Sequence, residues 1–302
     1  MGDPADLLVI SDCVLDIYYV VDRLPIGSGD ISIAREVAVS PGGACNVAII
    51  ARKFGLRVSI VDRVGNDLFG DVLIKELEEA GVDTKLLKRI NGPTTISNNI
   101  VGGEGHAFLG YVGVNVDLSI DDLDVQVFNG VDAVYISGFN ASISRKAAKE
   151  LLRIVSLIRN YPVKLFLDVG PARDNLDIVM VMVRQADAIF MNREETGRLF
   201  GDSLPSTINS LASLGINAVI KLGDNGAILI HKGETKHCKP YTPSRIITTV
   251  GAGDTFNAAY IAGTIKGLDP EEACDLGNKV ASMRLNYLTP KDLPDLRHMV
   301  DY

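Results

Sequence analysis

The sequence predicts an α/β fold in which a mostly parallel sheet is covered on both faces by helices. Two observations support this fold class. Short apolar runs rich in β-branched residues alternate with longer segments of helical period along most of the chain, and two glycine-rich segments interrupt that alternation. Because strand, helix and strand in repeated order form the unit of parallel sheets, the alternation favours a parallel core with a separate β element.

The apolar runs are the predicted strands of the central sheet. Each is short and is bounded by polar or turn-forming residues, as buried strands are. They are Leu7–Ile10, Val58–Val61, Ala133–Ile136, Val163–Leu167, Ala188–Phe190, Ala218–Leu222 and Ala227–Ile230.

Segments with apolar residues at helical spacing lie between and after these strands. A breaker, Gly267–Pro270, separates the last two of them. The predicted helices are Ala44–Phe54, Phe69–Ala80, Arg145–Ile158, Ile178–Gln185, Arg193–Phe200, Ile208–Leu214, Asp254–Lys266 and Pro270–Asn286.

The two interrupting segments, Tyr18–Val39 and Thr94–Val112, contain strand-like runs joined by glycine-rich turns, with no helical pattern between them. We interpret both as antiparallel hairpins that lie outside the parallel core. The sequence therefore predicts one domain over residues 1–302, with a small β-sheet made by discontinuous segments at about 15–40 and 93–114.

Composition limits the classes of function. The chain has 302 residues, of which 47% are hydrophobic and 23% charged, so a large core is expected. A net charge of −8 argues against nucleic acid as a partner, although it allows a small anionic ligand. No stretch is long and apolar enough for a membrane span, and the acidic N-terminal residues do not resemble a signal peptide. We expect a cytoplasmic protein.

The four cysteines, at positions 13, 45, 238 and 274, form no CxxC pair. Adjacent His237 and Cys238 provide only a weak zinc signal, because neighbouring side chains usually diverge. The expectation is structural thiols in a reducing compartment.

The stretch TTVGAGDTFNAAY places Asp254 just after Gly251, Ala252 and Gly253, where a helix is predicted to begin. Small residues and free N–H groups at a helix start can bind an anion such as phosphate. Asp254 is then either a helix cap or a base beside that phosphate, and this stretch alone favours neither. The chain lacks a P-loop, and the third glycine of a dinucleotide fingerprint is missing.

A second glycine motif, SPGGACNVAIIARKFG, is predicted to form a Pro-Gly-Gly turn followed by a helix. Asn46 would lie in the first turn of that helix, where it caps the helix or donates to a ligand hydroxyl. Asp168 lies at a predicted strand end. It either acts in the site or caps the next turn, and the sequence favours neither role.

These two motifs resemble the two signatures of the ribokinase-like (PfkB-type) carbohydrate kinases. Other segments agree in order along nearly the whole chain: VGNDLFGD, YVGVN, LDVGPAR, MNREE and KLGDNGA. The resemblance implies a three-layer ribokinase-like fold with a β-sheet lid, and transfer of the γ-phosphoryl group of ATP to a hydroxyl of a small acceptor.

The resemblance also assigns roles to residues at the phosphoryl end. Asp254 resembles the general base, with Gly251, Ala252 and Gly253 as the anion hole. The NxxE motif matches Asn192 with the nucleotide phosphates and Glu195 with Mg²⁺. The remaining nucleotide-binding matches are Lys221, Gly223, Gly226 and Asn278, and Lys221 is a departure because Thr is common there. Backbone donors would stabilise the phosphate without a cation that quenches the base.

At the acceptor end, the resemblance implies that Asp16 grips hydroxyl groups together with Gly42, Gly43 and Asn46. Asp12 is a candidate second contact. The hairpins correspond to the lid, which closes over the acceptor and often forms a homodimer.

The acceptor is expected to be a sugar or sugar-like alcohol, with a nucleoside as the alternative. A non-catalytic sugar- or nucleotide-binding regulator is the other class to consider. Many relatives read DTTGAGD and use its first Asp to hold a monovalent cation. Thr248 occupies that position here, so we expect weak dependence on potassium.

Overall fold

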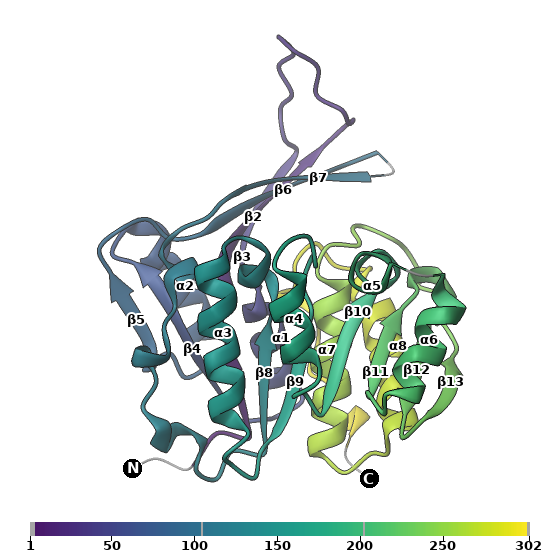
Figure 1. The fold of residues 1–302 in the computed structure, drawn as a ribbon. Coiled ribbons are helices and arrows are strands. Elements are labelled where there is room, and N and C mark those ends of the chain that lie inside the picture. Colours follow the sequence, from purple (N-terminus) through teal and green to yellow (C-terminus); the bar gives the residue numbers. More distant parts are fainter. Residues whose placement is uncertain (1–3, 104, 202, 301–302) are drawn as a thin grey trace.

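A computed structural model describes residues 4–103, 105–201 and 203–300 (Figure 1). Its centre is a nine-stranded sheet with the order β13-β12-β11-β10-β9-β8-β1-β4-β5. The pairs from β10–β11 through β4–β5 are parallel, whereas β12 pairs antiparallel with both β11 and β13. The strands are β1 (Leu7–Ile10), β4 (Val58–Gly65), β5 (Leu87–Ile90), β8 (Ala133–Ser137), β9 (Lys164–Asp168), β10 (Ala188–Asn192), β11 (Ala218–Lys221), β12 (Ala227–His231) and β13 (Glu234–Cys238).

Two layers of helices cover this sheet. Strand β1 shows why both faces need cover, because all four of its residues are buried: Leu7 and Val9 pack into one core cluster, while Leu8 and Ile10 pack into the other. The first layer contains α1 (Ala44–Lys53), α2 (Leu68–Glu79), α7 (Ala252–Ile265) and α8 (Pro270–Arg284). The second contains α3 (Arg145–Ile158), α4 (Leu176–Val183), α5 (Arg193–Phe200) and α6 (Leu204–Ser213).

Short 3₁₀ helices complete the framework, and most lie in connections between the main elements. They are η1 (Val114–Asp117), η2 (Ile120–Asp122), η3 (Val125–Phe128), η4 (Phe139–Ser142), η5 (Gly223–Asn225), η6 (Pro290–Asp292) and η7 (Arg297–Met299). Within the described ranges, no helix has the length and apolar character that crossing a bilayer requires. The predicted three-layer α/β architecture is confirmed.

A separate four-stranded sheet stands over one end of the central sheet (Figure 1). We call it the small sheet; its strands are β2 (Cys13–Val21), β3 (Glu36–Gly43), β6 (Ile96–Gly102) and β7 (Gly105–Tyr111), in the order β3-β2-β6-β7. The two predicted hairpins are present as antiparallel pairs, and β2 joins them by pairing parallel with β6. Because β2 follows β1 almost directly, the small sheet lies at the carboxyl end of the parallel strands.

Some local predictions were wrong. Pro41, Gly42 and Gly43 do not form a turn; they are the last residues of β3, which leads directly into α1. Strands β5 and β13 were not predicted, because both are edge strands with mostly exposed or half-exposed residues and no clear apolar pattern.

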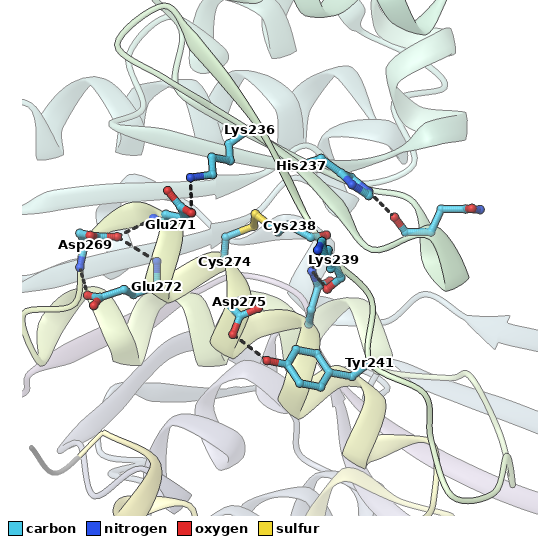
Figure 2. The surroundings of a disulfide bond; sticks show 12 residues. Lys236, His237, Cys238, Lys239, Tyr241, Asp269, Glu271, Glu272, Cys274 and Asp275 are labelled. Carbon is cyan, nitrogen blue, oxygen red and sulfur yellow. Dashed lines mark hydrogen bonds and ion pairs between the residues drawn. A yellow bond between two sulfur atoms is a disulfide. The ribbon is translucent and has the colours of Figure 1, made fainter.

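The prediction of free thiols was also wrong, because all four cysteines form disulfides. Cys13–Cys45 joins β2 to α1, and Cys238–Cys274 joins the end of β13 to α8 (Figure 2). The Cα–Cα distances are 5.1 and 6.2 Å, within the normal range for a disulfide. Separations of 32 and 36 residues hide this proximity from a search for local motifs. Among the described residues no cluster that could hold a metal ion includes His237 and Cys238.

Candidate active site

A cavity of about 820 Å³ opens at the carboxyl ends of the parallel strands, where α/β sheets usually bind ligands. Each neighbouring strand delivers a polar side chain to it, and α7 adds another. These residues are Asp12 after β1, Ser137 on β8, Asp168 on β9, Asn192 on β10, Lys221 on β11 and Asp254 on α7.

Two helix starts meet at the wall of this cavity. Helix α7 begins at Ala252 after Gly251, whose φ of 76° is in the left-handed region that favours glycine. Asp254 is therefore in the first turn of α7, as predicted. Asn46, buried in the first turn of α1, donates its side-chain amide to Asp254 Oδ2 at 2.9 Å. The structure thus brings together the two glycine motifs, although 208 residues separate these side chains.

The surroundings of Asp254 adjust its acidity. Burial raises the pKa of Asp254 to about 6, and the negative charge of Asp168 acts in the same direction. The hydrogen bond from Asn46 and the charges of Lys221 and Arg284 lower the pKa of Asp254. A carboxyl with a pKa of about 6 is mostly ionised at pH 7 and can still accept a proton, as a general base must.

The glycine loop before α7 is only partly as predicted. The Ala252 amide donates to the Thr249 carbonyl at 3.2 Å, so this N–H group is shared with the protein itself. The Gly251 carbonyl accepts from both the amide and the hydroxyl of Thr255, which closes the first turn. At Gly253, a β-carbon would lie 3.4 Å from Lys221 Nζ, so the backbone there directly faces an ammonium group.

Lys221 contradicts the prediction that no cation lies beside the base. Its Nζ is 3.0 Å from Asp168 Oδ2 and 3.1 Å from Asn257 Oδ1, and Asn257 also donates to Asp168 Oδ2 at 2.7 Å. Burial alone would lower the pKa of Lys221, but the charges of Asp168 and Glu195 raise it. Asp168 also accepts the Gly170 amide at 2.9 Å, so it both caps the next turn and holds Lys221 in the site.

The NxxE motif forms a reciprocal capping box at the start of α5. The Asn192 amide donates to Glu195 Oε2 at 2.7 Å, and the Glu195 amide donates to Asn192 Oδ1 at 2.9 Å. Burial and the charge of Asp168 raise the pKa of Glu195 to about 7. Both side chains line the cavity, so the cap also fixes two polar groups at the predicted phosphate end.

These residues suit Mg²⁺ bound together with a nucleotide. No group of three acidic, cysteine or histidine side chains within the described residues could hold a metal by itself. Mg²⁺ commonly uses only one or two carboxylates and takes its other ligands from phosphates and water. Asp168 and Glu195, both on the cavity wall, meet that requirement.

At the acceptor end, two buried carboxyls lie at the base of the small sheet. Asp12 Oδ2 accepts from the Ser137 hydroxyl at 3.0 Å, and Asp16 Oδ2 accepts from the Tyr18 hydroxyl at 3.3 Å. Burial raises the pKa of Asp16 to about 7 and raises the pKa of Asp12 well above its ordinary value. Gly42 leaves room for Asp16, because a β-carbon there would lie 2.2 Å from the carboxyl group.

The structure separates the predicted acceptor residues into two groups. Asp12 and Gly43 line the cavity, whereas Asp16, Gly42 and Asn46 lie behind its wall, near the junction with the small sheet. The Gly43 position is also crowded, because a β-carbon there would lie 2.1 Å from the Asp12 carbonyl. The five residues are neighbours, as the motifs imply.

Hydrogen bonds and a disulfide join the end of β13 and the segment after it, on another wall of the cavity, to α8. Asn278 donates its side-chain amide to the carbonyls of Cys238 and Lys239 at 3.0 Å each, so its donor is occupied by the protein. Figure 2 shows the disulfide Cys238–Cys274 beside the hydrogen bond from Tyr241 to Asp275. Gly223 and Gly226 line the same end of the cavity. All five residues predicted to bind the nucleotide, Asn192, Lys221, Gly223, Gly226 and Asn278, line the cavity.

Sequence reasoning missed two buried polar residues of this region. Asn257 is one turn beyond Asp254 on α7, and this i, i+3 spacing was the available signal. Arg284, at the end of α8, has no exposed surface at all. A charged residue in an otherwise ordinary helix pattern gave no indication that it would be buried.

The chain belongs to the pfkB family of carbohydrate kinases, whose model matches residues 4–293. Carbohydrate kinases of this family are ATP-dependent phosphotransferases. An uncharacterized sugar kinase of Archaeoglobus fulgidus is 27% identical over 235 residues, which are 76% of this chain and 92% of that protein.

Solved structures share the fold. An adenosine kinase from Sinorhizobium meliloti is similar with a TM-score of 0.86 at 21% identity, covering 98% of each chain. An Arabidopsis thaliana ribokinase complexed with ribose and ATP has a TM-score of 0.79 at 22% identity, covering 98% of this chain and 97% of that one.

The buried carboxyls of the site predict an unusual dependence of stability on pH. Asp62, which accepts the Cys13 amide at 2.7 Å, has its pKa raised by burial from 3.8 to about 7. A raised folded-state pKa stabilises the fold fully below the unfolded pKa, and this stabilisation disappears as the pH rises through 7. We expect the melting temperature of the ligand-free protein to fall between pH 5 and pH 8, and Asp62→Asn to reduce that fall.

Differential scanning fluorimetry across this pH range measures the effect. The exposed Asp121→Asn serves as a control and should follow the wild type. A melting temperature that is constant or rises over the range would contradict the prediction.

Proposed function

We propose that the protein transfers the γ-phosphoryl group of ATP to a hydroxyl of a small sugar or sugar-like acceptor. The observation that carries the proposal is the position of Asp254. It is in the first turn of α7, hydrogen-bonded to Asn46, and lines a cavity with a lysine on one side and buried carboxyls on the other. Family membership supports the same reaction.

In the proposed reaction, Asp254 accepts the proton of the acceptor hydroxyl as its oxygen attacks the γ-phosphorus. The bond between that phosphorus and the β–γ bridging oxygen breaks, and ADP leaves with the electron pair. Phosphoryl transfer depends on positioning and charge stabilisation more than on covalent catalysis. The hydrogen bond from Asn46 fixes the Asp254 carboxylate for this single proton transfer.

Charge on the transferring group is stabilised by the start of α7 together with Lys221. We assign Gly251, Ala252 and Gly253 to the phosphate loop, with the Ala252 amide partly occupied by Thr249. Lys221 lies beside Gly253, and its pairing with Asp168 keeps its ammonium from moving onto Asp254. Mg²⁺ held by Glu195 and Asp168 would neutralise further phosphate charge when bound.

The nucleotide occupies the end of the cavity opposite the acceptor. Asn192 and Lys221 face its phosphates in this proposal, while Gly223, Gly226 and Asn278 border the base. Apolar contact for the base comes from Ala281, Leu285 and Ile246, which line this part of the cavity.

The acceptor in this proposal is a neutral polyhydroxylated molecule. Asp12 and Asp16 are buried at the acceptor end and accept hydrogen bonds from hydroxyl groups already, as they would from a sugar. A sugar phosphate or sugar acid would bring negative charge to two carboxyls, which costs free energy without a compensating cation. A nucleoside also presents ribose hydroxyls, so nucleosides belong in the acceptor screen.

We further propose that residues 1–302 act as one catalytic domain, with the small sheet as a lid, in the cytoplasm where ATP is available. The lid would also form a homodimer with a second copy of this chain. Strand β7 is an open edge, and the two edge strands expose large apolar side chains, a combination that favours pairing. These side chains are Val37, Phe108, Leu109 and Tyr111.

Replacement of the base gives the first test of the reaction. Asp254→Asn is nearly isosteric, so folding and ATP binding should persist while kcat falls by about two orders of magnitude or more. ADP release measured across sugars, inositols and nucleosides identifies the acceptor and gives kcat. The exposed Asp121→Asn is the control, and turnover of Asp254→Asn within a few-fold of wild type would refute the assignment.

The acceptor site is tested by Asp16→Ala. A carboxylate that binds hydroxyls contributes about 1.5–3 kcal/mol, so the KM for the acceptor should rise about 10- to 100-fold while the KM for ATP changes little. Asn278→Ala is the reciprocal control, because it should weaken ATP more than the acceptor. Equal changes for both ligands in Asp16→Ala would show that the acceptor site is elsewhere.

The dimer is tested by placing a charge on the exposed edge. Leu109→Glu should convert a dimer to a monomer in light scattering, because burying a carboxylate in an apolar interface is costly. Leu214→Glu, an equally drastic change at the exposed end of α6, should leave the mass unchanged. A wild-type protein that is monomeric at assay concentration would contradict the proposal.

A further inference from the structure

Arg284 is a charged residue with no exposed surface, and the reaction described above does not use it. Its Nη1 donates to the Tyr287 carbonyl at 2.6 Å, and its Nη2 donates to the Leu288 carbonyl at 3.1 Å. Its buried Nε has no hydrogen-bond partner among the described residues. Burying a guanidinium with an unused donor is costly, so the position of this group needs a reason.

The turn that Arg284 holds supports the glycine loop before α7. Ile247 donates its amide to the Leu285 carbonyl at 2.7 Å, and the Ser244 hydroxyl and Arg245 amide both donate to Asn286 Oδ1. Val250 packs with Leu288 and Tyr18 in a small apolar cluster. The segment from 244 to 250 therefore rests on residues 285–288, and Arg284 holds the last two carbonyls of that turn, those of Tyr287 and Leu288.

The guanidinium also lies directly behind the loop. A β-carbon at Gly251 would be 3.7 Å from Arg284 Nε, and 3.5 Å from the side-chain nitrogen of Asn46. Tyr18, fully buried beside Arg284, donates its hydroxyl to Asp16. One cation is thus near both the loop that leads to the base and the carboxyl assigned to the acceptor.

We propose that Arg284 is a positioning residue for phosphoryl transfer: its buried guanidinium fixes the glycine loop before α7 and supplies a permanent positive charge behind it. This inference rests on the proposed kinase function. Thr248 is buried and accepts the Val250 amide through its hydroxyl, so it contributes no charge to the loop. Arg284 provides that charge from within the chain, which gives a structural reason for weak dependence on potassium.

The electrostatics of Asp254 agree with this role, because the charge of Arg284 lowers the pKa of Asp254 against the effect of burial. Removing Arg284 should therefore move the acidic limb of the pH profile of kcat to higher pH. Other groups on the neighbouring helices and strands also interact electrostatically or by a hydrogen bond with Asp254. They are Asn46, Asp168, Lys221, Glu195, Asp12, Asp16, Tyr18 and Tyr135.

The test uses Arg284→Met, Arg284→Lys and a matched control, Arg52→Met. Arg52 is a good control because it also donates to a backbone carbonyl, that of Leu56, and also has a buried Nε without a partner among the described residues, but it lies at the far end of α1. A misplaced loop should lower kcat of Arg284→Met by about 100-fold, with smaller changes in both KM values. Arg284→Lys should lose less, and Arg52→Met should keep wild-type kcat.

Chemical rescue separates positioning from general loss of structure. Millimolar guanidinium should restore turnover of Arg284→Ala several-fold, whereas urea at the same concentration should not, and Arg52→Ala should not respond to either. If the Met and Ala variants do not fold, the kcat of Arg284→Lys decides, because lysine keeps the positive charge but lacks the two guanidinium nitrogens that hold the Tyr287 and Leu288 carbonyls. A variant that folds with wild-type kcat and an unmoved pH profile overturns the proposal.

Hydrogen exchange, which does not depend on turnover, tests the role of Arg284 separately from the proposed kinase function. Hydrogen exchange of the amides in residues 244–254 should be at least tenfold faster in Arg284→Met than in wild type, and unchanged in Arg52→Met. Faster exchange in Arg284→Met, combined with a wild-type protein that phosphorylates no acceptor, would reject the kinase function and retain the loop role. Unchanged exchange, with turnover present, would reject the role of Arg284.

Discussion

The contact between the first turns of α1 and α7 is the constraint on which the site depends. The hydrogen bond from Asn46 to Asp254 can form only if both helices start at the same place and pack on the same face of the sheet. Glycines precede both helices: Gly42 and Gly43 before α1 leave room for Asp16 and Asp12, and Gly251 before α7 lies close to the side chain of Asn46. A shift of either helix by one residue would turn one of the two side chains away by about 100°, as the helical repeat requires.

Charge balance is the second constraint. The site gathers Asp12, Asp16, Asp168, Glu195 and Asp254, and burial raises the pKa of four of them. Lys221 and Arg284 oppose this negative charge, because both lower the pKa of Asp254. Lys221 faces the cavity beside Gly253, whereas Arg284 acts from behind the loop. In the proposed reaction a nucleotide phosphate would therefore lie on the side of Lys221, and the proposed acceptor end keeps its buried carboxyls.

The sequence predicted the fold well where patterns are local. Strand β1 and helices α3 and α5 begin and end at the predicted residues, because apolar periodicity and capping residues define them. Edge strands β5 and β13 were missed because exposure removes the apolar pattern. The disulfides and the burial of Arg284 depend on contacts between distant segments, which no local pattern encodes. The position of Asp254 was predicted, but its bond to Asn46 required the packing of two helices.

The two halves of the candidate site differ in the groups that form them. The phosphoryl half uses helix starts, backbone amides and strand ends, so its geometry follows from the fold itself. The half that we propose for the acceptor uses side chains at the base of the small sheet, including Asp16, Tyr18 and Asn99, the last of which lowers the pKa of Asp16 by a hydrogen bond. The small sheet has its own strand pairing, but Tyr18 on β2 and Val101 on β6 also pack with Val250 in the loop before α7. Substitutions on the small sheet that leave this cluster intact should therefore alter the proposed acceptor end and keep the contact between α1 and α7.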